Sequence, residues 1–158
     1  MSSFTQSTQT LPLAFSPEVL QALRDKTPIV ALESITIAKR NGIAMIEIEN
    51  IIRENNATPA TIAIIKGQIR VGLTIKEIQD LEVKKDKLRR IGRKDIATTL
   101  VYKEWAVTNG SAAMLIAHMA GIKVLVTADF QGVGIEGEAT YEVSRDIAEL
   151  GNTYFYLE

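Results

Sequence analysis

The chain has 158 residues, of which 46% are hydrophobic and 23% charged, with a formal net charge of −1 and no cysteine. These values are typical of one globular domain with a sizeable core. The small net charge gives no long-range attraction to nucleic acid or acidic lipid, and the lack of cysteine excludes disulfides and thiolate chemistry. No apolar run approaches the roughly 20 residues of a membrane span. We therefore expect a cytoplasmic protein without nucleic-acid or membrane partners.

The N-terminal part predicts a polar arm followed by a helix and a buried strand. Residues 1–14 are expected to form a flexible arm, and residues 15–158 a single α/β domain. Ser16, Pro17 and Glu18 are the residue types that open a helix, as cap, first-turn proline and first-turn acid. The β-branched and apolar run Ile29–Ile37 is typical of a buried strand.

The next elements are a long helix, a hairpin and two shorter helices. Ile43–Asn55 has apolar residues at helical spacing, with Glu47, Glu49, Arg53 and Glu54 predicted on its outer face. Thr61–Ile65 and Gln68–Val71 predict a hairpin across a turn at Lys66-Gly67. Thr74 and Glu77 form a capping box for a helix over Thr74–Leu81. The basic run Lys84–Lys94 is expected on the surface, before a helix over Asp95–Trp105.

The last part predicts two helix-strand pairs separated by a glycine-rich loop. Asn109–Ala120 is expected to be a helix that Gly121 ends, and Ile122–Thr127 a buried strand. After the loop, a helix over Thr140–Leu150 should end at Gly151, and a strand is expected over Tyr154–Leu157. Strands that alternate with helices predict a layered α/β/α sandwich with a mixed, partly parallel sheet. The edge of the last strand needs a partner, so we expect an oligomer.

Glu33 is the first candidate for chemistry. It interrupts an apolar strand immediately before Ser34. Burial disfavours a carboxylate, raises its pKa and makes it a usable general acid. The alternative is an exposed glutamate at the end of a strand, without a chemical role.

A second candidate is the acidic segment Tyr141–Asp146. Glu142 and Asp146 are four residues apart, so a helix places both carboxylates on one face, where their oxygens could hold manganese or magnesium. The alternative is a solvated helix face on which Glu142 pairs with Arg145.

Two further segments could bind an anion. Arg89, Arg90, Arg93 and Lys94 could bind a phosphate, a role that suits the planar guanidinium group, although a charge run is also typical of a solvated face. The helix start at Thr108–Ser111 offers free amides and, at Gly110, room for close approach, although plain capping explains it as well. His118, the only histidine, is interpreted as a packing or surface residue.

Three stretches together resemble the front half of the pseudouridine-5'-phosphate glycosidase (indigoidine synthase A-like) family. They are VALES at Val30–Ser34, NNATPATIAIIKGQIRVGLT at Asn55–Thr74 and MAGIKVLVT at Met119–Thr127. The resemblance covers nearly the whole chain, in the family's order. It implies a fold truncated relative to the family's, reversible cleavage of pseudouridine 5'-phosphate to uracil and ribose 5-phosphate, a manganese ion and a homotrimer.

The resemblance also implies a role for particular residues. Glu33 matches the family's proton donor and Glu142 its metal ligand, where the family has aspartate. The substrate-binding positions match Arg90, Gly110, Ser144, Arg145 and Asp146. Arg90 stands where the family has lysine.

The chain departs from the family at its loops and at the nucleophile. ITIAKRNG at Ile35–Gly42 lacks the family's histidine and proline, and Gly134 and Ile135 replace a histidine–arginine pair. The segment with the lysine that attacks the opened sugar has no match in the chain. Since the covalent step is the core of that mechanism, we expect impaired glycosidase activity. The alternatives are a non-catalytic relative that binds a sugar phosphate or a partner protein, and an α/β domain without a ligand.

Overall fold

One mixed sheet forms the centre of the protein, and the computed structural model describes residues 12–127, 145–152 and 156–157 of the chain. Within these ranges the strand order is β1-β4-β3-β2-β7-β8, with β6 beside β3 and β5 beside β6. The strands are β1 (Leu13–Phe15), β2 (Ile29–Glu33), β3 (Thr58–Ile65), β4 (Gln68–Val71), β5 (Arg89–Ile91), β6 (Ala106–Thr108), β7 (Val124–Val126) and β8 (Tyr156–Leu157).

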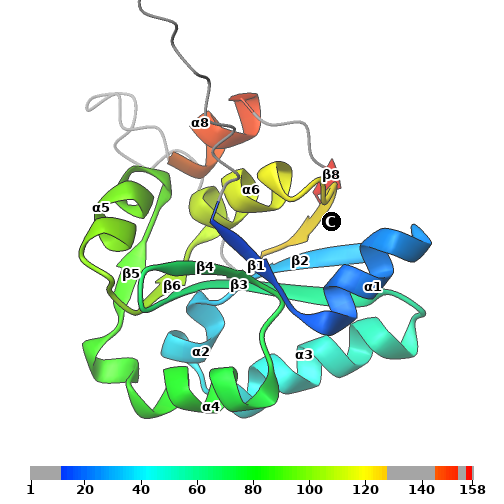
Figure 1. Ribbon diagram of the computed structural model, residues 1–158, viewed down its shortest axis with the longest axis horizontal. Helices are drawn as coiled ribbons and strands as arrows, with labels where there is room; N and C mark the ends of the chain where they lie inside the picture. Colours follow the sequence, from blue (N-terminus) through cyan, green and yellow to red (C-terminus); the bar gives the residue numbers. More distant parts are fainter. Residues whose placement is uncertain (1–11, 128–144, 153–155, 158) are drawn as a thin grey trace, which may run out of the picture.

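Helices cover both faces of this sheet (Figure 1). The helices are α1 (Pro17–Asp25), α2 (Ile35–Lys39), α3 (Gly42–Glu54), α4 (Ile75–Val83), α5 (Ile96–Val101), α6 (Gly110–Met119) and α8 (Arg145–Asn152), with 3-10 turns η1 (Lys85–Lys87) and η2 (Arg93–Asp95). The predicted layered α/β class with a partly parallel sheet is confirmed. β3 pairs antiparallel with β4 and β6, and the other neighbouring strands pair in parallel.

β3 separates two apolar clusters because its side chains alternate between the faces of the sheet. Ile62 and Ile64 pack with α6 and with Val19 of α1 on one face. Ala63 and Ile65 pack on the other face with α2, α3 and α4. We call these the α6 face and the α3 face. Every residue of β3 after Thr58 is buried, which accounts for its nearly continuous apolar sequence.

Several predicted elements are confirmed. The helix over Ile43–Asn55 is α3, and the hairpin is formed by β3 and β4 across Lys66-Gly67. The capping box is present, since Thr74 Oγ1 accepts a hydrogen bond from the Glu77 amide and Glu77 Oε2 accepts one from the Thr74 amide. Gly121 has a φ of +76° directly after the last turn of α6, the left-handed conformation that suits a glycine helix stop.

Other element boundaries were predicted wrongly. The first buried strand ends at Glu33, because Ser34 begins a turn into α2. The helix expected over Asp95–Trp105 covers only Ile96–Val101, and β6 follows it. Gly151 lies inside α8 rather than after it. Leu13 and Ala14, assigned to the arm, belong to β1, which is held by parallel pairing with β4.

Glu49 was predicted on the wrong face of its helix. It is only 2% exposed, because α3 lies on the sheet with Glu49 turned towards β3. There Glu49 Oε1 accepts a hydrogen bond from Thr61 Oγ1 at 2.6 Å, and Oε2 lies 3.2 Å from Arg53 Nη2. Burial raises the pKa of Glu49 above its ordinary value, against the opposing effects of Thr61 and Arg53.

In the described part of the chain, no helix has the length and apolar character that crossing a membrane requires.

Candidate functional site

Two strands run towards each other along the same side of β3 and meet at its middle. β2 pairs in parallel with the first part of β3, ending with Glu33 opposite Ile62. β6 pairs antiparallel with the second part, placing Val107 opposite Ala63. The carboxyl ends of β2 and β6 therefore face each other between Ile62 and Ala63. We call this place the strand junction.

Two neighbouring strands also end at the strand junction. β7 is parallel to β2, with Val126 beside Leu32, and β5 is parallel to β6, with Ile91 beside Thr108. Four carboxyl ends from opposite directions thus converge. In open α/β sheets, ligands bind outside the carboxyl ends of strands, at the point where the strand order reverses. The strand junction likewise gathers carboxyl ends of strands, which makes it the candidate site.

Glu33 is buried at the strand junction, with an exposed fraction of 3%. Alternation along β2 places its side chain on the α6 face, because Ala31, two residues earlier, packs in that cluster. The structure thereby removes the alternative of an exposed strand-end glutamate. A buried carboxyl group at the carboxyl end of a strand is suited to proton transfer.

Ser34 and Thr108 join the ends of β2 and β6 directly, and both are fully buried. The Thr108 amide donates to Ser34 Oγ at 2.9 Å, and the Ser34 amide donates to Thr108 Oγ1 at 3.3 Å. The two hydroxyl oxygens are 3.3 Å apart, and the Thr108 hydroxyl donates to the Ile62 carbonyl at 2.7 Å. The sequence suggested Thr108 only as part of a helix start and gave no role to the Ser34 hydroxyl. The available signal was a serine directly after the strand-end glutamate and a threonine directly before the Asn109-Gly110 helix start.

The start of α6 is fixed against the end of β5. Asn109 caps α6, accepting a hydrogen bond from the Ala112 amide at 3.2 Å, and its own amide donates to the Ile91 carbonyl at 2.9 Å. The Arg93 amide donates to Ser111 Oγ at 3.3 Å. Gly110 follows the cap and is buried. The predicted capping of α6 is therefore present, with Asn109 as the cap. Gly110, in the first turn of α6, lies at the strand junction, near the end of β2.

Arg90 lies near the strand junction but on the other face of the sheet. It pairs with Val107 in the β5–β6 ladder, and Val107 packs in the cluster of the α3 face. Arg90 itself is exposed. Arg89, on the α6 side, lies 2.8 Å from Glu104. The structure thus brings Glu33 and Gly110 together and sets Arg90 across the sheet from Glu33.

The acidic segment is only partly visible. Glu142 and Ser144 lie outside the described residues. Arg145 and Asp146 open α8, which packs against α6, but of these two the structure describes the backbone alone. Among the described residues no group of three histidine, cysteine or acidic side chains could hold a metal ion. The metal site and the substrate-binding role of Asp146 stay predictions.

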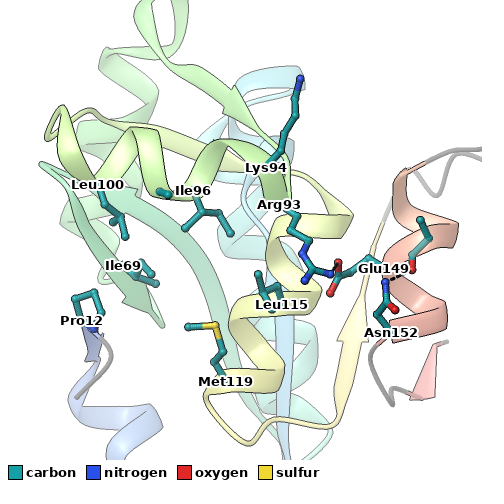
Figure 2. A pocket seen from close by; sticks show the side chains of 12 residues that line it. Pro12, Ile69, Arg93, Lys94, Ile96, Leu100, Leu115, Met119, Glu149 and Asn152 are labelled. Carbon is teal, nitrogen blue, oxygen red and sulfur yellow. Dashed lines mark hydrogen bonds and ion pairs between the residues drawn. The ribbon is translucent and has the colours of Figure 1, made fainter. Parts of the chain in front are cut away.

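A separate apolar groove of about 530 Å³ lies between β4, α5, α6 and α8. Figure 2 shows Ile69, Leu115 and Met119 along it, while Lys94 points away from it. At one side Arg93 Nη1 lies 2.5 Å from the carboxylate of Glu149, a residue that is 2% exposed. Glu33 and Gly110 do not line this groove.

Comparison with protein families matches residues 18–157 to the family described as indigoidine synthase A-like protein. The pseudouridine-5'-phosphate glycosidase of Legionella pneumophila is 42% identical over 146 residues, covering 89% of this chain and 47% of the relative. The enzyme of the same name from Escherichia coli is 40% identical, with the same coverage. The chain spans about half the length of the curated relatives it matches.

Two solved structures share the fold. The prealnumycin C-glycosynthase AlnA, in complex with ribulose 5-phosphate, superposes with a TM-score of 0.85 at 34% identity, over 92% of this chain and 48% of AlnA. An indigoidine synthase A-like protein of Thermotoga maritima gives a TM-score of 0.80 at 21% identity, over 98% of this chain and 51% of that protein. The second likeness concerns the fold alone.

Proposed function

Because this chain belongs to the family of indigoidine synthase A-like proteins, we propose that its strand junction binds a phosphorylated pentose for the reversible cleavage of pseudouridine 5'-phosphate to uracil and ribose 5-phosphate. We propose further that turnover by these 158 residues is impaired, because none of their lysines matches the family's nucleophile motif. The observation that carries this proposal is the meeting of buried Glu33 with the start of α6 at four converging strand ends. It is supported by curated relatives named pseudouridine-5'-phosphate glycosidase and by a neighbour solved with ribulose 5-phosphate.

The chemistry assigns a role to Glu33. The bond to be broken joins two carbons, so no oxygen leaving group exists for a carboxylic acid to protonate. The uracil carbon that departs must instead gain a proton, and a carboxyl group in its acid form can deliver it. In the reverse direction the same group removes that proton. Glu33, 3% exposed at a strand end, is the residue proposed for this proton transfer.

The phosphate would lie past the strand ends, where both faces of the sheet can reach it. Gly110, in the first turn of α6, offers backbone amides without a side chain in the way. Arg90 would approach from the α3 face, and a guanidinium suits a phosphate through its planar set of donors. Ser144, Arg145 and Asp146 complete the proposed set of substrate-binding residues on the resemblance alone.

Manganese is also proposed on the resemblance alone. Glu142 would be its ligand through a carboxylate oxygen, the donor type that this ion prefers. The ion would supply charge stabilisation to the bound sugar phosphate. Addition of Mn²⁺ should then raise the melting temperature of the wild type and leave that of Glu142→Gln unchanged.

The sharpest test of the proposed function is titration with ribose 5-phosphate, with ribose as the ligand that lacks the phosphate. We expect wild type to bind ribose 5-phosphate and to respond little to ribose. Arg90→Gln should weaken the binding about tenfold, the typical worth of one charge-assisted hydrogen bond. Arg24→Gln, which removes an exposed arginine of α1, is the matched control and should bind as wild type does. Equal binding by all three proteins would remove Arg90 from the site, and no binding by wild type would refute the proposed function.

A further inference from the structure

The head-on meeting of β2 and β6 creates two buried backbone amides that no neighbouring strand pairs. Ser34 lies one residue past the last pair of β2 with β3, and Thr108 one past the last pair of β6 with β3. Instead, the Ser34 amide donates to Thr108 Oγ1 at 3.3 Å, and the Thr108 amide donates to Ser34 Oγ at 2.9 Å. Two residues 74 positions apart in the chain thus satisfy each other's backbone.

The protons of this pair can be assigned from valence alone. A carbonyl oxygen can only accept a hydrogen bond, so the Thr108 hydroxyl donates its single hydrogen to the Ile62 carbonyl oxygen. Thr108 Oγ1 is then left as an acceptor, which makes the Ser34 hydroxyl the donor between the two side-chain oxygens. Each buried hydroxyl both donates and accepts. Such a fully satisfied buried network holds one arrangement rigidly.

The pair lies between the two parts of the candidate site. Ser34 directly follows Glu33, and Thr108 comes two residues before Gly110. Without the pair, only the ladders of β2 and β6 with β3 would hold the end of β2 near the start of α6. The pair adds an end-to-end link across the strand junction itself.

We infer that Ser34 and Thr108 are positioning residues, which fix the Glu33 carboxyl group at a set distance from the α6 amides so that both meet one sugar phosphate. This inference rests on the proposed function. The strand ladders already hold β2 and β6 to β3, so the pair is placed to control geometry at the strand junction more than the existence of the fold. Misplacement of a reacting group by about 1 Å is enough to lose a large part of the function of a site.

The test compares Thr108→Val with Thr108→Ser. Valine keeps the shape of threonine and removes the hydroxyl, whereas serine keeps the hydroxyl and removes a methyl group. Thr99→Val is the matched control, since Thr99 is equally buried and its hydroxyl donates to the Asp95 carbonyl at 2.8 Å in α5, outside the strand junction. Calorimetric titration of the full chain with ribose 5-phosphate gives the affinity, under conditions where circular dichroism shows each variant folded.

We expect Thr108→Val to bind at least about tenfold more weakly, a factor that the net free energy of one hydrogen bond supplies. Thr108→Ser and Thr99→Val should bind within about twofold of wild type. Should Thr108→Val fail to fold, Ser34→Ala gives the same measurement, because it leaves the Thr108–Ile62 bond in place. Wild-type affinity in the hydroxyl-free variant, or equal losses in Thr108→Val and Thr108→Ser, overturns the positioning role while the proposed function stands. Absence of binding in wild type overturns both.

Discussion

The buried carboxyl group of Glu49 allows a prediction about stability and pH that does not depend on any ligand. Glu49 is 2% exposed, and burial is the largest influence on its pKa, which is raised. Its folded-state pKa is therefore above the unfolded value, so protonation favours the folded state. The stability that this brings is complete below the unfolded pKa of about 4.3 and is lost as the pH rises through the folded pKa.

Two substitutions separate the contributions of charge and contact. Glu49→Gln keeps an oxygen that accepts from Thr61 and removes the buried charge, so its cost at neutral pH should stay below about 1 kcal/mol, close to the value of one ordinary hydrogen bond. Glu49→Ala also removes one buried methylene group, Cγ, at about 0.8 kcal/mol. It leaves the buried Thr61 hydroxyl without its acceptor, at about 1 to 3 kcal/mol. We therefore expect a loss of about 2 to 4 kcal/mol for Glu49→Ala.

Urea unfolding of wild type and Glu49→Gln from about pH 5 to 8 measures the predicted linkage. Wild type should lose stability relative to the glutamine variant as the pH rises, and the difference should then become constant. The exposed partners contribute little to this difference, since the Arg53 and Glu18 side chains are 37% and 45% exposed. A wild type that gains stability relative to glutamine as the pH rises would mean that Arg53 outweighs burial, and the reasoning would be wrong.

Three further predictions concern glycines and chemistry. Gly72→Ala should cost more than about 2 kcal/mol, because φ is +84° and the new Cβ would overlap Ser16 Oγ, the cap of α1, and lie 2.7 Å from Val19 Cγ2. Gly121 has a similar φ of +76° but open space around it, so Gly121→Ala should lower the free energy of unfolding by only about 1 kcal/mol, measured by thermal unfolding. Equal losses of stability in the two variants would contradict the steric argument. We expect the 158-residue chain, incubated with uracil, ribose 5-phosphate and Mn²⁺, to form little pseudouridine 5'-phosphate and to give no borohydride-stable adduct. The reason is that none of its lysines lies in the family's nucleophile motif. Rapid formation of the product would refute this prediction.

The sequence predicted correctly those features that depend only on residues close together in the chain. The capping box at Thr74, the turn at Lys66-Gly67 and the stop at Gly121 each depend on neighbouring residues, and all three are present. Glu49 was misplaced because nothing within α3 marks which polar residue faces the sheet. Its partner Thr61 comes from a strand twelve residues later, and the hydrogen bond between them is what makes the burial of Glu49 tolerable.

β6 was missed because it has only three residues, Ala106–Thr108, between a helix and a helix cap. So short a run carries no clear periodicity of its own, and it becomes a strand through its ladders with β3 and β5. The candidate site depended on this missing strand. The sequence indicated Glu33 and the helix start at Gly110 separately, but their meeting follows from a tertiary pairing that no local pattern records.

The length of β3 explains why the two parts meet. Its eight residues, Thr58–Ile65, give β2 five partners and β6 two, so the strands fill one side of β3 end to end. A shorter β3 would leave β6 without its pairing to β3, and a longer one would separate Glu33 from the α6 start by about 3.3 Å for each added residue. One inserted residue would also turn the side chains that follow it to the opposite face. The length of β3 therefore sets the geometry of the candidate site, although β3 contributes no side chain to the proposed chemistry.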